Sequence, residues 1–239
     1  MKNKAKVIRN ILFGMLGAAM CMIAAWLSMG YGEDNVTNGF IQSNWAKMPF
    51  LRFEAAIVIY SIGIPICFVG LRYLAKVVRL SRRKRSIQDL RMAKLFEASV
   101  NIGAVGFLFV HVSYIMMAIV YKLLYTTNLM GADIISTTEG MFFYMAVPVL
   151  AFYIVAVGGS SISFMYFILQ ERIRVSKLCL LFNPLVFIVI GELLKLLKLS
   201  YISDFVAAAS AFGYLMMLQT GLVHVTKLKS ITRRREEEQ

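Results

Sequence analysis

The chain has 239 residues, of which 59% are hydrophobic and only 16% are charged. A soluble domain is about 45–50% apolar and about 25% charged, so this composition excludes an ordinary soluble enzyme or binding domain. The length fits one bundle of about five to seven spans of about 20 residues each, with no room for a separate soluble domain. We therefore expect one all-α membrane domain over residues 1–239.

The formal net charge of +13 could suggest a nucleic-acid partner, but the positions of the basic residues indicate membrane topology instead. All but six of the 26 Lys and Arg residues lie before the first apolar run, in residues 76–94, in a short turn near residue 174, or in the polar tail 227–239. We expect no nucleic-acid partner. The expected partner is a bilayer with anionic headgroups, contacted by Arg82, Arg83, Lys84 and Arg85.

Six apolar runs predict six transmembrane helices, at about residues 8–29, 53–74, 98–120, 141–169, 178–197 and 205–225. The first run is long enough to be a retained anchor rather than a cleaved signal. Six spans with both termini in the cytoplasm place every strongly basic segment on the inner side. The sequence thus predicts a multi-pass plasma-membrane protein whose loop 76–94 and tail 227–239 are cytoplasmic.

Small residues recur at helical spacing in the first and the last apolar run. Gly14 and Gly17 share one face of the first run, and Ser210, Gly213 and Gly221 share one face of the last. Such stripes are typical of close helix packing. An alternative is that the stripe of the last run lines a path across the membrane.

Ionisable residues inside the apolar runs are the candidate ligand-binding residues. A carboxylate at Glu192 that faced lipid would cost several kcal/mol, so we expect it to face the interior, a wet cavity or a partner group. His111 lies at a comparable depth and shares a helix face with Tyr114. Arg52 and Glu54, at the outer mouth of the second run, could extend the same cavity.

The sequence carries no pattern that predicts a cofactor or a metal site. The three cysteines lie in apolar runs without CxxC spacing, and we interpret them as buried free thiols. We find neither a Gly-rich phosphate loop nor a metal-binding motif. Weak candidates for acid–base chemistry are His111 and Glu192.

Trp45 and Arg52 precede a predicted span that contains Gly63 and Pro65. In this pattern the chain resembles a group of uncharacterised multi-pass bacterial membrane proteins. The resemblance implies a bacterial plasma-membrane protein, and it carries over no activity.

Three functions remain open at this point. The first is binding or translocation of a small or amphipathic ligand in an outward-facing cavity lined by Glu192, His111, Tyr114, Glu54 and Arg52. The second is a regulatory or immunity-type subunit that docks a partner through the small-residue stripes. The third is an intramembrane enzyme that acts on a lipid or isoprenoid through His111 and Glu192. We favour the first, which involves no covalent chemistry.

Overall fold

The computed structural model describes residues 4–29, 37–38, 41–79, 86–127, 134–196 and 202–237. Its α-helices are α1 (Lys4–Met29), α2 (Phe50–Arg79), α3 (Ile87–Thr126), α4 (Ile134–Tyr153), α5 (Ser160–Leu169), α6 (Pro184–Lys195) and α7 (Ile202–Glu237). A π-helix, η2 (Ile154–Gly159), joins α4 to α5, and 3-10 helices η1 (Ser43–Ala46) and η3 (Lys177–Leu181) lie before α2 and α6. A two-stranded antiparallel ribbon, β1 (Thr37–Asn38) and β2 (Ile41–Gln42), precedes η1. The prediction of an all-α fold is confirmed.

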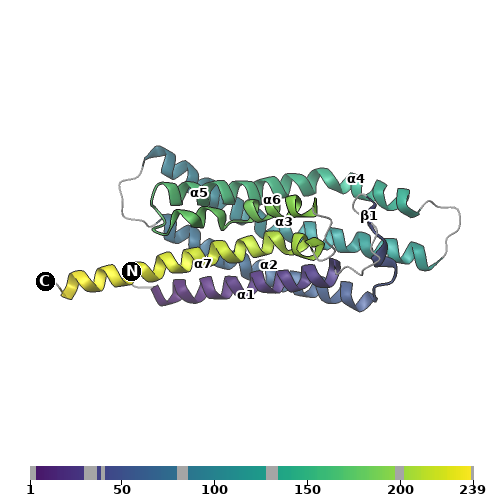
Figure 1. Ribbon diagram of the computed structural model, residues 1–239, viewed down its shortest axis with the longest axis horizontal. Helices are drawn as coiled ribbons and strands as arrows, with labels where there is room; N and C mark the ends of the chain where they lie inside the picture. The colour runs from purple at the N-terminus through teal and green to yellow at the C-terminus, as the bar shows by residue number, and fades with distance from the viewer. Residues whose placement is uncertain are drawn as a thin grey trace.

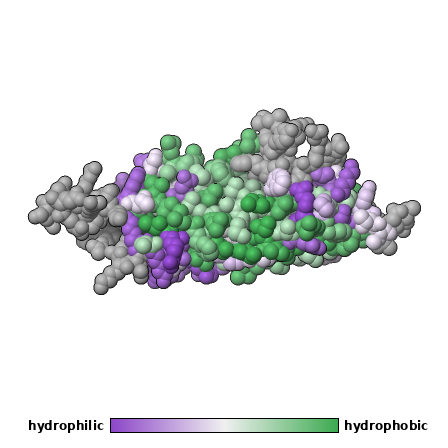
Figure 2. Space-filling model, turned by 90° about the horizontal axis from the view of Figure 1, so that it is seen from below, coloured by the Kyte–Doolittle hydropathy of each residue, from purple (hydrophilic) through white to green (hydrophobic). Residues whose placement is uncertain are grey.

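Within the described residues, five helical segments are long and apolar enough to cross a membrane: Lys4–Met29, Phe50–Arg79, Ile87–Thr126, Ile134–Leu169 and Val206–Lys227. Figure 2 shows an apolar band around the middle of the visible face, with hydrophilic residues towards both ends. Helices with this distribution satisfy their own backbone hydrogen bonds and present apolar side chains to lipid. The protein is therefore embedded in a membrane.

The segment predicted as one helix over residues 178–197 is divided. Residues 177–181 form η3, and α6 begins only at Pro184. The side chain of Asn183 caps α6 by accepting a hydrogen bond from the Val186 N–H at 3.2 Å, and a proline at the first helical position has no N–H to satisfy. Helix α6 has 12 residues and is about 18 Å long, whereas the hydrocarbon core of a bilayer is about 30 Å thick. The helix alone is therefore too short to cross that core.

Helix α3 is longer than the predicted span over residues 98–120. It runs without interruption for 40 residues, which corresponds to about 60 Å. Its start is fixed by a capping box, in which the Ser86 side chain accepts from the Asp89 N–H and the Asp89 carboxylate accepts from the Ser86 N–H. Because the helix is about twice as long as the hydrocarbon core is thick, its ends project beyond that core.

The two glycine stripes lie against other helices of the same chain. A Cβ added to Gly14 would come within 2.6 Å of the Gly70 Cα, and one added to Gly17 within 2.6 Å of the Gly63 carbonyl oxygen, so α1 and α2 are in backbone contact. On α7, a Cβ at Gly213 would lie 2.2 Å from the Pro184 Cα. These close approaches are possible only without a side chain.

Figure 1 shows an elongated bundle in which α7 lies alongside α1 and α6, with α3, α4 and α5 on the other side. Helix α1 begins and α7 ends at the same end of this bundle, where α2 also ends and α3 begins (Figure 1). We call this the terminal end. The opposite end carries β1 and is called the ribbon end. Between the two ends, α2, α3 and α7 meet through Phe68, Phe107 and Tyr214, whose ring centroids are 5.5–5.7 Å apart.

Candidate functional site

His111 lies in a shell of aromatic rings between α2 and α3. Its ring stacks on Tyr60, with centroids 4.3 Å apart and an interplanar angle of 11°. The Phe107 ring lies 5.7 Å away, one turn earlier on the same helix. Tyr60 is buried, whereas His111 and Tyr114 remain partly exposed. His111 is thus held in one orientation and is still accessible.

Tyr153, the last residue of α4, connects this aromatic shell to α6 and α7. Its ring centroid lies 5.1 Å from that of Phe107. Tyr153 hydrogen-bonds to Ser210 of α7, and its phenol lies near the Glu192 carboxylate of α6. His111 and Glu192 are therefore joined through Phe107 and Tyr153. We call Glu192, Tyr153, Ser210, Phe107 and His111 the intramembrane cluster.

Glu192 is exposed on α6, so its side chain does not face the interior of the bundle, which was one of the three surroundings expected for it. Val189 and Leu193, which flank it on this surface, are 50% and 59% exposed. The carboxylate therefore lies where a bound molecule could reach it from the side of the bundle. The phenol of Tyr153 is one of the groups near this carboxylate.

The π-helix η2 explains how Tyr153 reaches α7. A π-helix has i→i+5 hydrogen bonds, so its turn holds more residues than an α-helical turn and the side chains before and after it change register. The Ala156 carbonyl accepts a hydrogen bond from the Tyr214 hydroxyl at 3.0 Å and another from the Ser160 hydroxyl. Tyr153 and Ala156, which are three residues apart, thus both bond to α7.

Residues 41–48 close the ribbon end above the cluster. Trp45 is 1% exposed and packs edge-on against Tyr114, with centroids 5.4 Å apart. The Lys122 ammonium donates to the Ala46 carbonyl at 2.8 Å and lies 5.0 Å from the centre of the Phe50 ring. The segment is therefore fixed to α3 by both aromatic packing and a buried cation.

The other two predicted ligand-binding residues lie apart from this cluster. The Arg52 guanidinium donates to the Trp26 carbonyl at 3.2 Å and lies 5.3 Å from the centre of the Trp26 ring, so it ties α2 to α1. Glu54 is exposed on α2. Among the predicted packing residues, Ser210 is buried and Gly221 lies against Leu74. Arg82, Arg83, Lys84 and Arg85 lie outside the described residues.

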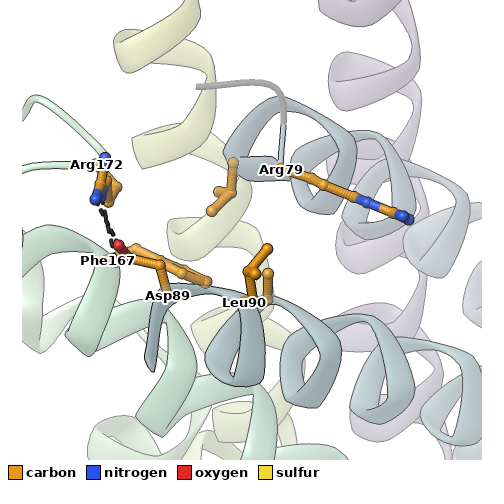
Figure 3. Close-up of a pocket in the computed structure, with 7 residues that line it drawn as sticks. Arg79, Asp89, Leu90, Phe167 and Arg172 are labelled. Atoms are coloured by element: carbon orange, nitrogen blue, oxygen red, sulfur yellow. Dashed lines mark hydrogen bonds and ion pairs between the residues drawn. The ribbon is translucent and has the colours of Figure 1, made fainter. Parts of the chain in front are cut away.

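A second candidate site is a pocket at the terminal end, which holds about 290 Å³ of space that is open to solvent (Figure 3). Its lining residues are Val78, Arg79, Asp89, Leu90, Ala93, Phe167 and Arg172. Arg172 points at Asp89 and pairs with it, whereas Arg79 points away and pairs with Glu97 at 3.3 Å. Among the described lining residues, each of the two arginines is therefore paired with a carboxylate.

The charged pair in this pocket ties together segments that are distant in sequence. Asp89 begins α3, and Arg172 lies in the turn after α5. The next residues of that turn are held as well, because the Arg174 N–H donates to Nδ1 of the buried His224 of α7 at 3.0 Å. We interpret the pocket as a structural junction.

Sequence reasoning missed Tyr60, Tyr153 and the pair of Asp89 with Arg172. The Ser86-x-x-Asp89 spacing is a readable capping signal, but it does not reveal the arginine. Tyr153 carries no sequence signal, because its position depends on the π-helix that follows it.

A family model described as a family of unknown function (DUF6796) matches residues 1–228. No curated protein matches the chain. No solved structure matches it either. The resemblance to an uncharacterised family is confirmed.

Proposed function

The chain belongs to the DUF6796 family of unknown function, and we propose that it is a plasma-membrane protein that binds or translocates a small amphipathic ligand at the intramembrane cluster. One observation carries this proposal: a carboxylate, a tyrosine and a histidine lie along a connected path within the apolar part of the bundle and remain partly or fully exposed. Ionisable residues at such depth are costly, and in membrane proteins they commonly mark a binding or transport site.

The proposed topology has six spans, with both termini in the bacterial cytoplasm. Residues 173–196, which contain η3 and α6, form the fifth and least regular crossing. Most of the basic residues that the structure describes lie at the terminal end, where α1 begins and α7 ends, and this favours the cytoplasmic side. The basic loop 76–94 then lies against anionic headgroups.

Two observations rank this function above the alternatives. The glycine stripes of α1 and α7 pack against Gly70, Gly63 and Pro184 of the same chain, which makes them less suited to docking a partner subunit. An enzyme that used Glu192 and His111 as acid and base would need both at one reacting centre, whereas the contacts that relate them run through the rings of Phe107 and Tyr153. Ligand binding requires no such direct contact.

The proposal predicts that the protein carries its ligand through purification. Mass spectrometry of molecules extracted from the purified protein should detect an amphiphile that is enriched over bulk lipid. Glu192→Gln and His111→Ala should each lower the ligand-to-protein ratio about tenfold, since a lost hydrogen bond to a charged group costs about 1.5 kcal/mol or more.

Glu139→Gln is the matched control, because Glu139 is an exposed acid of α4 outside the intramembrane cluster. This variant should retain the ligand at the wild-type ratio. If the small-molecule content is the same in the wild-type protein and in all three variants, the proposed function is wrong.

A further inference from the structure

We propose that a phospholipid with a net negative charge binds on the lipid-facing surface of α2 and α3, with its phosphate against Arg72, Lys76 and Asn101. We call these three side chains and the apolar surface beside them the α2–α3 site. It shares no residue with the intramembrane cluster, so this inference goes beyond the proposed function and does not depend on it.

The polar centre of the α2–α3 site is a hydrogen bond between the two helices. The Arg72 Nε donates to the Asn101 side-chain oxygen at 2.9 Å, and both side chains are exposed. The amide NH2 group of Asn101 and both Nη groups of Arg72 make no hydrogen bond to another described residue. Guanidinium groups bind phosphate through two parallel hydrogen bonds. The pair therefore presents mainly donors, which suit a phosphate.

Positive charge continues from this pair towards the end of α2. Arg72, Lys76 and Arg79 lie within about 60° of one another on one face of the helix, and all three are exposed. The Lys76 ammonium lies 4.9 Å from the centre of the Tyr73 ring. The described partners of Arg72 and Lys76 are thus an amide and an aromatic ring, which carry no charge. Both cations can still bind an anion.

The carboxylates of α2 and α3 do not neutralise these two cations. Glu54 lies near the start of α2, at the other end of the helix. In α3, Asp89 pairs with Arg172 and Glu97 pairs with Arg79. Among the described residues of the two helices, the α2–α3 site therefore keeps an excess of positive charge.

Towards the middle of the membrane the site continues as an apolar surface. The face of α2 that carries Arg72 also carries Val58 and Ile62, which are 57% and 48% exposed. The face of α3 that carries the amide also carries Val105 and Phe109, which are 69% and 39% exposed. Val58 lies about 21 Å from Arg72 along α2, whereas one leaflet holds about 15 Å of hydrocarbon. The surface can therefore contact acyl chains over the depth of a leaflet.

This combination favours an anionic lipid over a soluble anion and over a zwitterionic lipid. α2 ends and α3 begins at the terminal end, so the basic side chains lie on the water side of the apolar surface (Figure 1). A soluble anion could make the hydrogen bonds but would not cover the apolar surface. The ammonium of a zwitterionic head group would be repelled by Lys76, whereas an anionic head group is attracted by basic residues near the membrane surface.

Native mass spectrometry of the delipidated full-length protein in detergent tests the chemistry of the lipid. Dioleoylphosphatidylglycerol should bind about tenfold more tightly than dioleoylphosphatidylcholine, because the latter has no net charge. Glycerophosphoglycerol, which is the same head group without acyl chains, should not displace the bound lipid. Equal affinity for the two lipids, or displacement by the free head group, would overturn the proposal.

A matched pair of lysine substitutions tests the position of the site. Arg72→Gln and Lys76→Gln should each weaken binding of dioleoylphosphatidylglycerol about tenfold, since each removes hydrogen bonds to a charged group. Lys177→Gln is the control, because Lys177 is an exposed lysine of η3, outside α2 and α3. It removes the same charge and should change the affinity less than about twofold, because charges at a distance are screened. Equal losses in the two lysine variants would indicate a diffuse charge effect and overturn the site.

Asn101→Asp tests the site without removing the contact between the helices. The aspartate has nearly the same shape and can still accept from Arg72, but it neutralises the guanidinium. This variant should give a single gel-filtration peak like that of the wild-type protein and bind dioleoylphosphatidylglycerol about tenfold more weakly. Wild-type affinity in this variant would overturn the proposal. Glu192→Gln should bind this lipid as the wild-type protein does, so the result is distinguishable from a failure of the proposed function.

Discussion

Gly213→Ala is expected to destabilise the protein by about 3 kcal/mol, at the upper end of the range for overpacking. The added Cβ would lie 2.2 Å from Cα and 2.6 Å from N of Pro184, and 2.9 Å from the carbonyl carbon of Asn183. All three are backbone atoms at the start of α6, so no side-chain rotation can relieve the clash. Helix α6 would have to move away from α7, and it would take Glu192 with it.

A thiol-reactive fluorophore can follow this unfolding in detergent, because Cys21 and Cys67 are free and buried in the folded protein. Gly140→Ala is the matched control, since a Cβ there meets nothing within 4 Å and alanine is the better helix former. The control should unfold at or above the wild-type temperature. If Gly213→Ala does the same, the described packing of α7 on α6 is incorrect.

Asp89→Ala is expected to cost about 3–5 kcal/mol, because it leaves the charge of Arg172 buried without its partner. The side chains of Arg172 and Asp89 are only 12% and 8% exposed. The Arg172 Nε also donates to the second carboxylate oxygen at 3.3 Å, so the contact is bidentate. The same substitution removes the Asp89 half of the capping box at the start of α3, while the Ser86 half remains.

The chain provides a second arginine–carboxylate pair as a control. Arg79 and Glu97 lie 3.3 Å apart, but their side chains are 65% and 49% exposed. Exposed pairs contribute about 0–1 kcal/mol, so Glu97→Ala should have little effect. A double-mutant cycle over Asp89 and Arg172 should give a coupling energy several times larger than that over Arg79 and Glu97. Equal coupling energies would contradict the structural role of the junction.

The apolar helices could be predicted from hydropathy, and the start of α6 could have been predicted from its capping residues. Asn183 followed by Pro184 is a capping signal at the first helical position, but it lies within a long apolar run that hydropathy predicts as one span. The continuous helix α3 was missed at its start because charged residues interrupt the apolar pattern there. The capping box stabilises the first turn of α3 at that point despite the charged residues.

The candidate site could be predicted only in part. Glu192 and His111 were found because charge is rare inside apolar runs. The contacts that relate Glu192 to His111 could not be predicted. Placing residues on helix faces at about 100° per residue assumes regular α-helices, whereas the π-helix η2 follows Tyr153, which contacts Ser210. The Asp89–Arg172 contact spans 83 residues of sequence, and local patterns do not encode pairs at such separation.

The most direct measurement of the central claim is photo-crosslinking from inside the intramembrane cluster. A benzoylphenylalanine introduced in place of Tyr153 should form, on irradiation in native membranes, one dominant adduct with the mass of the bound amphiphile. The same group in place of Phe143, which is 78% exposed on α4, should label a mixture of bulk lipids. A lipid mixture at position 153 that matches the one at position 143 would contradict a specific site.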